Sequence, residues 1–371
     1  MRFLILAFLC LTVHASVRAE SHDDIAGKPD LVVDDASTLK KTVVLGALQQ
    51  KHQEGKNLLW CSTLQLCWNE LMKNEGGAVE LAGAPELAKF LNEKLADDTQ
   101  VNPAAVFTYV GTGPEVPKDL LAKLQKHFGG QASPKLVPQD VQALQTIFYS
   151  YLFRNLAFAN QFDTGNGGLY FKGATVAQFG VWAHSKNRGK LVRQVTIHDY
   201  AGPDDFVIEL DTTTQGDRLL LARVVPQQTL HDTVKWALAR LNREKRSWLQ
   251  EDENFVAPAL NFEIAARFPQ LKGLILAPKA TGASLVDAQQ LIRFRLDEKG
   301  AVLKSEAVLE KKESKGEPPK PRRFVLDGPF LILMQKKDAK VPYFAAWIDN
   351  DELLAPLKQS KLPREKRESK E

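Results

Sequence analysis

The stretch Arg293–Asp349 reads RFRLDEKGAVLKSEAVLEKKESKGEPPKPRRFVLDGPFLILMQKKDAKVPYFAAWID. It begins inside a run of alternating apolar residues, Leu291–Leu296, which predicts a strand. Glu310–Arg323 is charged and rich in proline, so it cannot bury itself. Two strand-like runs follow, Phe324–Met334 and Tyr343–Ile348. The stretch therefore predicts a strand, then a long exposed loop, then a buried C-terminal hairpin.

This order of elements resembles the serpin family, in which a strand of the central sheet ends in a hinge and is followed by a reactive loop and a C-terminal hairpin. The hinge is matched by Glu298 and Gly300, and the hairpin signature by Asp327-Gly328-Pro329-Phe330-Leu331 and Tyr343-Phe344. The resemblance is to a divergent serpin of a bacterial, exported type. It implies a single α+β domain with a large central β-sheet, further smaller sheets and about eight or nine helices.

The N-terminal half extends the resemblance. Asn57–Trp60 predicts a short strand and Ser62–Met72 a buried helix, as in the family, but Cys61 and Leu64 stand where serpins place serines or small residues beneath the sheet opening. The family's Phe-Lys-Gly strand motif has two candidate matches. One is Phe153-Arg154-Asn155, at the end of an aromatic-rich run that predicts a central strand, and the other lies within Leu169–Gly173. The spacing to later strands favours the first.

Further elements follow from periodicity and turn residues. Helices are predicted at Thr38–Lys51, Ala84–Leu95, Pro117–Phe128, Pro138–Gln145 and Leu230–Leu241. Strands are predicted at Pro103–Val110, Thr146–Phe158, Val192–His198, Asp205–Asp211, Arg218–Val225 and Asn254–Phe262. The last of these is interrupted by Pro258, because proline cannot donate to a ladder of backbone hydrogen bonds.

The first 19 residues predict a secretory signal peptide, with an apolar run after Arg2 and small residues at Ala15 and Ala19, after one of which we expect cleavage. The expected product is secreted or periplasmic. No other stretch is apolar enough to span a membrane. Residues 20–36 predict a loose segment, residues 37–356 the serpin-like domain, and residues 357–371 a charged, disordered tail.

The composition of the 371 residues, 44% hydrophobic and 25% charged, is that of a globular protein. A net charge of +4 without a dense basic-aromatic patch gives no reason to expect a nucleic-acid partner. Beyond the signal peptide only Cys61 and Cys67 remain. An exported chain could oxidise them, but two buried thiols are the favoured interpretation.

The sequence contains no constellation of catalytic residues. It has no zinc-ligand spacing, no Gly-x-Ser-x-Gly elbow and no phosphate-binding loop. His184 and His198 are best interpreted as surface or satisfied core residues. We therefore expect neither an enzyme nor a protein with a metal or cofactor.

Two functions remain. In a serpin-type inhibitor, the exposed loop at about residues 301–323 is cleaved by a serine protease, and the freed segment joins the central sheet. The alternative is a non-inhibitory serpin-fold protein with a binding or structural role. The two are distinguished by the residues after Gly300, because inhibitory serpins have small residues there and this chain has bulkier and charged ones.

Side chains of a strand point alternately to its two faces, so only every second residue after Gly300 would point into the sheet. If Ala301 points inward, so do Leu303, Ser305 and Ala307, none of which is charged. The family's spacing from Gly300 places the scissile bond near Ser314–Lys315. The candidate scissile residues are Lys312, Ser314 and Lys315, which suggest a trypsin-like serine protease as the partner of a monomeric protein.

Overall fold

The computed structural model describes residues 24–357 apart from 26, 133–134, 136, 138–139, 144, 166, 242–245, 277–283, 286–287 and 301–320. The expected signal peptide, with Ala15 and Ala19, and nearly all of the charged tail lie outside the described residues. Within the described part of the chain, no helix is long and apolar enough to cross a membrane.

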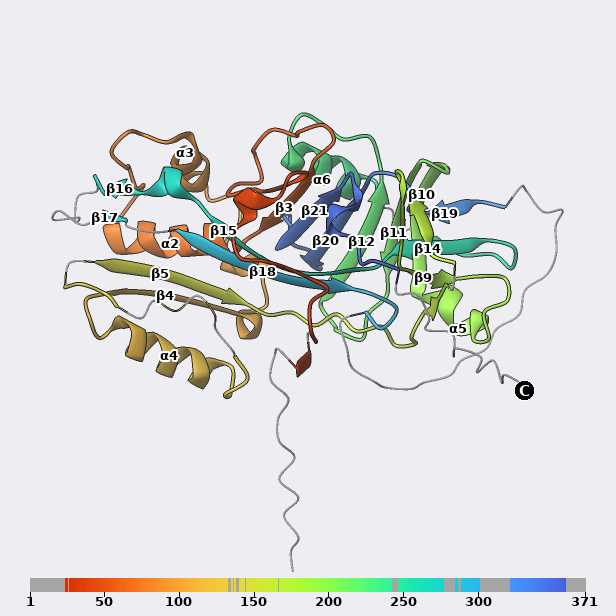
Figure 1. Ribbon diagram of the computed structural model, residues 1–371, viewed down its shortest axis with the longest axis horizontal. Helices are drawn as coiled ribbons and strands as arrows, with labels where there is room; N and C mark the ends of the chain where they lie inside the picture. Colours follow the sequence, from red (N-terminus) through yellow and green to blue (C-terminus); the bar gives the residue numbers. More distant parts are fainter. Residues whose placement is uncertain are drawn as a thin grey trace, which may run out of the picture.

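The largest sheet has eight strands in the order β13-β10-β11-β12-β20-β21-β3-β2. Their bounds are β13 Ser247–Trp248, β10 Val195–Gly202, β11 Asp205–Leu210, β12 Asp217–Arg223, β20 Phe330–Lys336, β21 Phe344–Ile348, β3 Asn57–Cys61 and β2 Thr42–Val44. Figure 1 shows the C-terminal hairpin β20–β21 inside this sheet, between β12 and β3.

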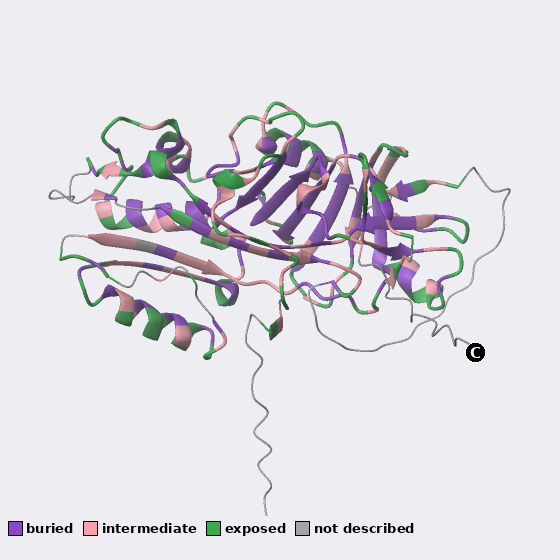
Figure 2. Cartoon of the chain, in the orientation of Figure 1, coloured by how far each residue is buried: buried purple, intermediate pink, exposed green. Residues whose placement is uncertain are grey.

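The hairpin is the centre of the core. Its large side chains are at most 4% exposed: Phe330, Leu331, Leu333, Phe344 and Trp347. In Figure 2 both strands are buried along most of their length. The predicted hairpin is confirmed, although its first run is divided into β19, Arg323–Val325, and β20.

The remaining strands form smaller sheets. Their bounds are β1 Leu31–Val33, β4 Val106–Thr112, β5 Thr146–Leu152, β6 Asp163–Thr164, β7 Leu169–Phe171, β8 Ala174–Val176, β9 Gln178–Val181, β14 Asn254–Pro258, β15 Leu260–Arg267, β16 Gly273–Leu274, β17 Ser284–Leu285 and β18 Gln289–Leu296. The sheet orders are β1-β15-β18, β19-β14-β9-β6, β4-β5, β7-β8 and β16-β17. The large central sheet expected from the resemblance is therefore divided in the described residues, and the largest sheet is the one that contains the hairpin.

Five α-helices occur in the described residues, fewer than the eight or nine expected. They are α2 Thr63–Glu75, α3 Glu86–Asn92, α4 Val116–His127, α5 Arg188–Leu191 and α6 Leu230–Ala239. The short 3-10 helices are η1 Ala36–Thr38, η2 Asp98–Gln100, η3 Pro103–Ala105, η4 Val192–Gln194, η5 Pro269–Leu271 and η6 Asp351–Leu353.

Two predicted helices are wrong. The segment Thr38–Lys51 forms β2 and turns instead, because β2 pairs in parallel with β3 and the Leu45 amide continues this pairing by donating to the Leu59 carbonyl at 2.8 Å. The described residues of Pro138–Gln145 are not helical, and Val141 is instead buried against α4. The segment expected to be loose contains β1, which pairs in parallel with β15.

The predicted interruption at Pro258 has a large effect on topology. β14 ends at Pro258, β15 begins at Leu260, and the two strands belong to different sheets. The Ala259 amide between them donates to the Ala177 carbonyl at 2.9 Å, so the chain is anchored where it changes sheet.

Helices cover both faces of the pair β4–β5. Figure 1 shows α2 on one side and α4 on the other. Helix α2 contacts both strands, and α4 contacts β4. Leu120 and Leu124 of α4 are fully buried and lie in one cluster with Tyr109 and Tyr149 of the two strands. This sandwich forms one border of the candidate site.

Candidate functional site

The candidate hinge lies at the end of β18, where the chain turns through Asp297–Gly300. The Gly300 amide donates to the Asp297 carbonyl at 3.1 Å, and the Lys299 amide donates to Asp297 Oδ1 at 3.0 Å. Gly300 has φ +73°, a left-handed conformation that favours glycine. Burial raises the pKa of Asp297. The nearby positive charge of Arg295 acts in the opposite direction and offsets part of this increase.

The hinge is held against the segment that follows β5. Ala157 and Gly300 form an antiparallel bridge. The Phe158 amide donates to the Lys299 carbonyl at 3.2 Å, and the Phe162 amide donates to the Glu298 carbonyl at 2.8 Å. The point where the chain leaves toward residue 301 is therefore fixed by backbone contacts at Glu298, Lys299 and Gly300.

We expect Gly300→Ala to destabilise the protein by roughly 2–3 kcal/mol, measured by chemical unfolding. A Cβ at Gly300 would lie 2.6 Å from the Phe158 amide nitrogen and 2.7 Å from the Leu156 carbonyl oxygen. Gly55 is a matched control, because it has φ +72° and an added Cβ would have nothing within 4 Å. Equal losses for Gly300→Ala and Gly55→Ala would show that the close contacts at Gly300 are unimportant.

The rest of the candidate loop lies outside the described residues. This applies to Ala301, Leu303, Ser305 and Ala307 of the expected hinge, and to Lys312, Ser314 and Lys315 of the expected scissile region. The structure therefore places the two ends of the loop, at Gly300 and Arg322.

Beside the hinge, β5 and β18 are each the last strand of their own sheet. Gln145, just before β5, bridges Ser284 in parallel, and Ala157, after β5, bridges Gly300. β5 and β18 thus run in the same direction between two bridges. In the described residues no ladder pairs these two strands, so their facing edges form a gap in hydrogen bonding that starts at the hinge.

Helix α2 lies beneath both edges, since it contacts β5 as well as β18. Gln290 of β18 donates from Nε2 to the Cys61 carbonyl at 3.0 Å and to Thr63 Oγ1 at 2.6 Å. Cys61 is 8% exposed and Leu64 is 7% exposed, so both of the bulky substitutions noted in the sequence are buried here.

One ion pair joins the two sides. Lys135, in the connection from α4 to β5, donates from Nζ to both carboxylate oxygens of Glu263 on β15 at 2.7 Å. The Glu263 side chain is only 9% exposed. No pattern in the sequence signals this contact, because the two residues lie 128 positions apart.

The far end of the loop is anchored by Arg322. Its guanidinium donates to both carboxylate oxygens of Glu253, from Nε at 2.7 Å and from Nη2 at 3.0 Å, and its Nη1 donates to Ser247 Oγ at 3.2 Å. The guanidinium carbon also lies 5.3 Å from the centre of the Phe324 ring. The next residues form β19, which pairs in parallel with β14.

Glu253→Gln should cost about 1–2 kcal/mol at pH 7, and this cost should shrink as the pH falls below the unfolded pKa of about 4.3. Burial alone would raise the pKa of Glu253, but hydrogen bonds from Arg322 and the Gln250 amide, together with the charge of Arg322, lower it. A carboxylate with a lowered pKa stabilises the fold above its unfolded pKa, about 4.3, and this contribution is lost as the pH falls through the folded pKa.

The measurement is urea unfolding of both proteins from pH 3.5 to 7.5. The difference in unfolding free energy between wild type and Glu253→Gln should grow with pH through the acidic range. A difference that stays constant with pH would contradict the anchor's ionic character.

Cys61 and Cys67 are both free thiols, and Cys61 is buried while Cys67 is half-buried, so the favoured interpretation of two buried thiols holds in full for Cys61 only. Burial raises the pKa of Cys61, and it raises that of Cys67 to about 12. A buried thiol with a raised pKa is a poor nucleophile. The two thiols therefore serve packing rather than chemistry.

The histidines singled out in the sequence lie apart from the hinge. His198 is 8% exposed, and its Nε2 lies 2.9 Å from Glu209 Oε2. His184 stacks on Trp182 with 6.3 Å between ring centres. Across the described residues, no group of three or more metal-ligating side chains is arranged to hold a metal ion.

Comparison with known proteins gives matches among solved structures only, since no family model and no curated protein matches the chain. Maspin matches with a TM-score of 0.51 and 11% identity, over 79% of this chain and 92% of its own. The fold is serpin-like. Serpin48, described as a highly specific serpin of the insect Tenebrio molitor, matches with a TM-score of 0.44 and 13% identity, over 79% of this chain and 91% of its own.

In this serpin-like fold, the resemblance seen in the hinge and hairpin residues is confirmed at the level of architecture. Of the two candidate Phe-Lys-Gly matches, Phe153-Arg154-Asn155 directly follows β5 at the edge of the gap. Lys172 and Gly173 instead form the turn of the small hairpin β7–β8.

Proposed function

We propose that this chain is an exported serpin-like inhibitor that a serine protease attacks in the segment between Gly300 and Arg322. The observation that carries the proposal is the gap between β5 and β18, two edges that run in the same direction. A segment returning from Gly300 would lie antiparallel to both strands and could pair with each. Only a segment that has been cut free at its far end could pair with both strands along its whole length.

The chemistry of the proposal is that of acyl transfer. The protease serine oxygen attacks the carbonyl carbon of the residue before the scissile bond near Ser314–Lys315, for a trypsin-like enzyme a lysine such as Lys312 or Lys315. An ester forms with that carbonyl, the peptide bond breaks, and the nitrogen of the next residue takes up a proton as the new amine. If the freed segment enters the gap at that stage, the esterified protease is carried with it. Hydrolysis of the ester requires the protease active site in its productive geometry. In the proposed complex the protease no longer holds that geometry, so the ester persists.

Entry of the segment has a structural consequence at Lys135. Adding one strand separates β5 from β18 by about 4.8 Å more than direct pairing would. The ion pair from Lys135 to Glu263 at 2.7 Å spans the two sides of the gap. It must therefore break or move with β15, and this cost opposes insertion.

A non-inhibitory binding or structural role is the second candidate. It is favoured by the charges farther along the segment, because Lys311 and Glu313 would be the next inward residues after Leu309. Burying an unpaired charge is costly, so complete insertion meets a barrier that partial insertion does not.

The test is incubation of the mature chain with trypsin-like serine proteases, followed by denaturing electrophoresis and mass spectrometry. The proposal predicts a covalent complex whose mass equals protease plus chain minus the released C-terminal fragment. Cleavage between residues 301 and 322 with no such complex would favour the non-inhibitory role. N-terminal sequencing of the exported protein tests cleavage after Ala15 or Ala19.

A further inference from the structure

A hollow of about 440 Å³ lies on the face of the eight-stranded sheet that α6 covers. This volume is within the range of pockets that hold small organic ligands. Its main lining residues are Arg218, Lys235, Leu238, Leu241, Gln335 and Lys340. The hollow thus lies between the last turn of α6, strands β12 and β20, and the turn after β20, and it shares no residue with the hinge or the anchor.

The strand register brings the polar residues of the floor together. Arg218 of β12 and Gln335 of β20 are direct antiparallel partners, so their side chains lie on the same face of the sheet. Two residues along, Leu220 and Leu333 pack in the same cluster as Val234 of α6. The floor of the hollow is therefore the polar end of a face that is otherwise apolar and covered by the helix.

The floor carries two buried polar atoms without a hydrogen-bond partner among the described residues, Arg218 Nε and Gln335 Oε1. Gln335 is 3% exposed, and its Nε2 donates to the Ala339 carbonyl at 2.6 Å. That bond fixes the amide orientation and leaves the oxygen as an unused acceptor. A buried acceptor and a buried donor left unpaired are costly. Both atoms have almost no solvent-accessible area, so water or a ligand in the hollow pairs with them only if the neighbouring side chains move.

The charges around the hollow are mainly positive. Arg218, Lys235 and Lys340 line it, and Asp338 is the acidic residue among its lining. The charge of Arg218 also acts on Glu209 of β11. The positive charge available to a ligand therefore comes mainly from Lys235 and Lys340, while Leu238 and Leu241 supply an apolar wall.

We infer that this hollow binds an organic anion with an apolar body and a hydrogen-bond donor. The apolar body packs on Leu238 and Leu241, and the acidic group lies near Lys235 and Lys340. The donor reaches Gln335 Oε1 when the neighbouring side chains move aside. This inference does not depend on the proposed inhibitory function.

Two fluorescent probes of nearly the same shape test the role of charge. 8-Anilinonaphthalene-1-sulfonate has an aromatic body, an N–H donor and a sulfonate, whereas N-phenyl-1-naphthylamine lacks the sulfonate. We expect the sulfonate probe to bind with one site per chain and at least about tenfold more tightly than the neutral probe. Each tenfold step in affinity is a clear difference in a titration. Equal affinity would overturn the inference.

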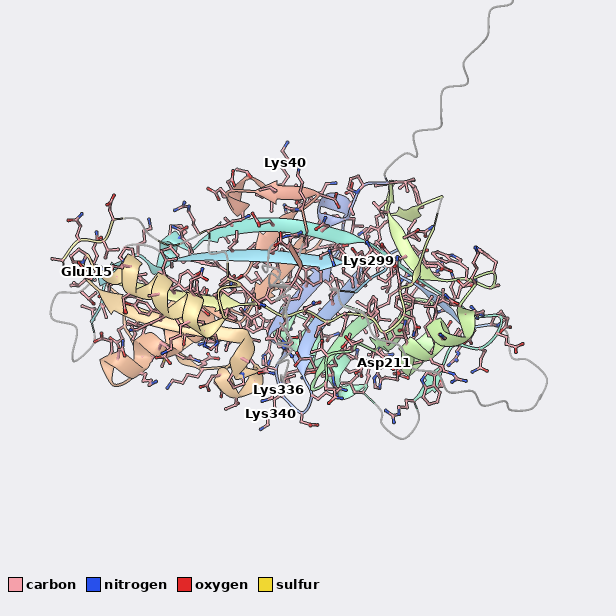
Figure 3. All side chains as sticks on the ribbon, turned by 90° about the horizontal axis from the view of Figure 1, so that it is seen from below. Lys40, Glu115, Asp211, Lys299, Lys336 and Lys340 are labelled. Carbon is pink, nitrogen blue, oxygen red and sulfur yellow. The ribbon has the colours of Figure 1, made fainter. Side chains whose placement is uncertain are left out.

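Variants locate the site. Lys235→Ala combined with Lys340→Ala should weaken sulfonate-probe binding by about tenfold or more, and Gln335→Leu should weaken both probes. Lys40→Ala is the control, because Figure 3 shows Lys40 at the opposite edge of the molecule from Lys340. Unchanged binding in the lysine double variant, with an unchanged melting temperature, would place the probe elsewhere and refute the site.

Discussion

Cleavage of the chain between Gly300 and Arg322 should raise its melting temperature by roughly 5 °C, which in a domain of this size corresponds to a net gain of roughly 3–5 kcal/mol. In the intact chain the segment is tied at both ends, to the bridge at Ala157 and to the pair with Glu253. After cleavage one end is free. The segment can then pair with the edges of β5 and β18 at once.

The gain comes from backbone hydrogen bonds on both sides and from burial of Leu303, Ala307 and Leu309. Ordering the segment and fitting the bulk of Leu303 oppose it. We expect the favourable terms to exceed these costs because the inward positions as far as Leu309 carry no charge. The measurement is differential scanning calorimetry of intact protein and of protein nicked by a trypsin-like enzyme.

Two matched substitutions make this result specific to insertion. Ala301→Arg places a charge at the first inward position and should abolish the gain, since burying that charge is costly. Val302→Arg places the same charge at the neighbouring outward position and should leave the gain intact. An unchanged melting temperature on cleavage of the wild type would support the non-inhibitory role.

The parts of the fold predicted from the sequence are those in which local pattern and burial agree. Helix α6 begins one residue after Thr229, whose side chain accepts from the Asp232 amide, and its apolar periodicity matches its buried face. The C-terminal hairpin was predictable for the same reason. Its strands are apolar on both faces because they lie inside a sheet that is covered on both sides.

The prediction was wrong where an apolar run is buried without forming a helix. Leu45 and Leu48 are each 1% exposed and lie at helix-like spacing, but they belong to turns after β2. Their burial comes from contacts with α6 and the large sheet, which are distant in sequence. Periodicity alone cannot distinguish such a segment from an amphipathic helix.

The candidate site was only partly predictable for a related reason. Gly300 is recognisable because a turn with positive φ requires glycine. The partners that hold the loop ends are not, since Glu253 lies 69 residues from Arg322 and Ala157 is an ordinary apolar residue. Ion pairs and strand edges of this kind become visible only when the fold brings them together.

Phe330→Ala should destabilise the protein by roughly 3–5 kcal/mol, measured by chemical unfolding. Phe330 is 0% exposed and pairs with Ile348 across the hairpin. Its ring meets that of Phe171 edge-on, with 6.2 Å between centres. Removing the ring leaves a cavity that the sheet cannot close, because β20 is bonded to β12 on one side and to β21 on the other.

Tyr170→Ala is the control for loss of an aromatic side chain, since Tyr170 neighbours Phe171 but is 68% exposed. Its effect should stay within about 0.5 kcal/mol, as for most surface substitutions. Loss of less than about 1 kcal/mol in Phe330→Ala would mean that the hairpin is not the packed centre of the fold. In that case β19 and the anchor at Arg322 would lose their support as well, because both are joined to the hairpin by only a few residues of chain.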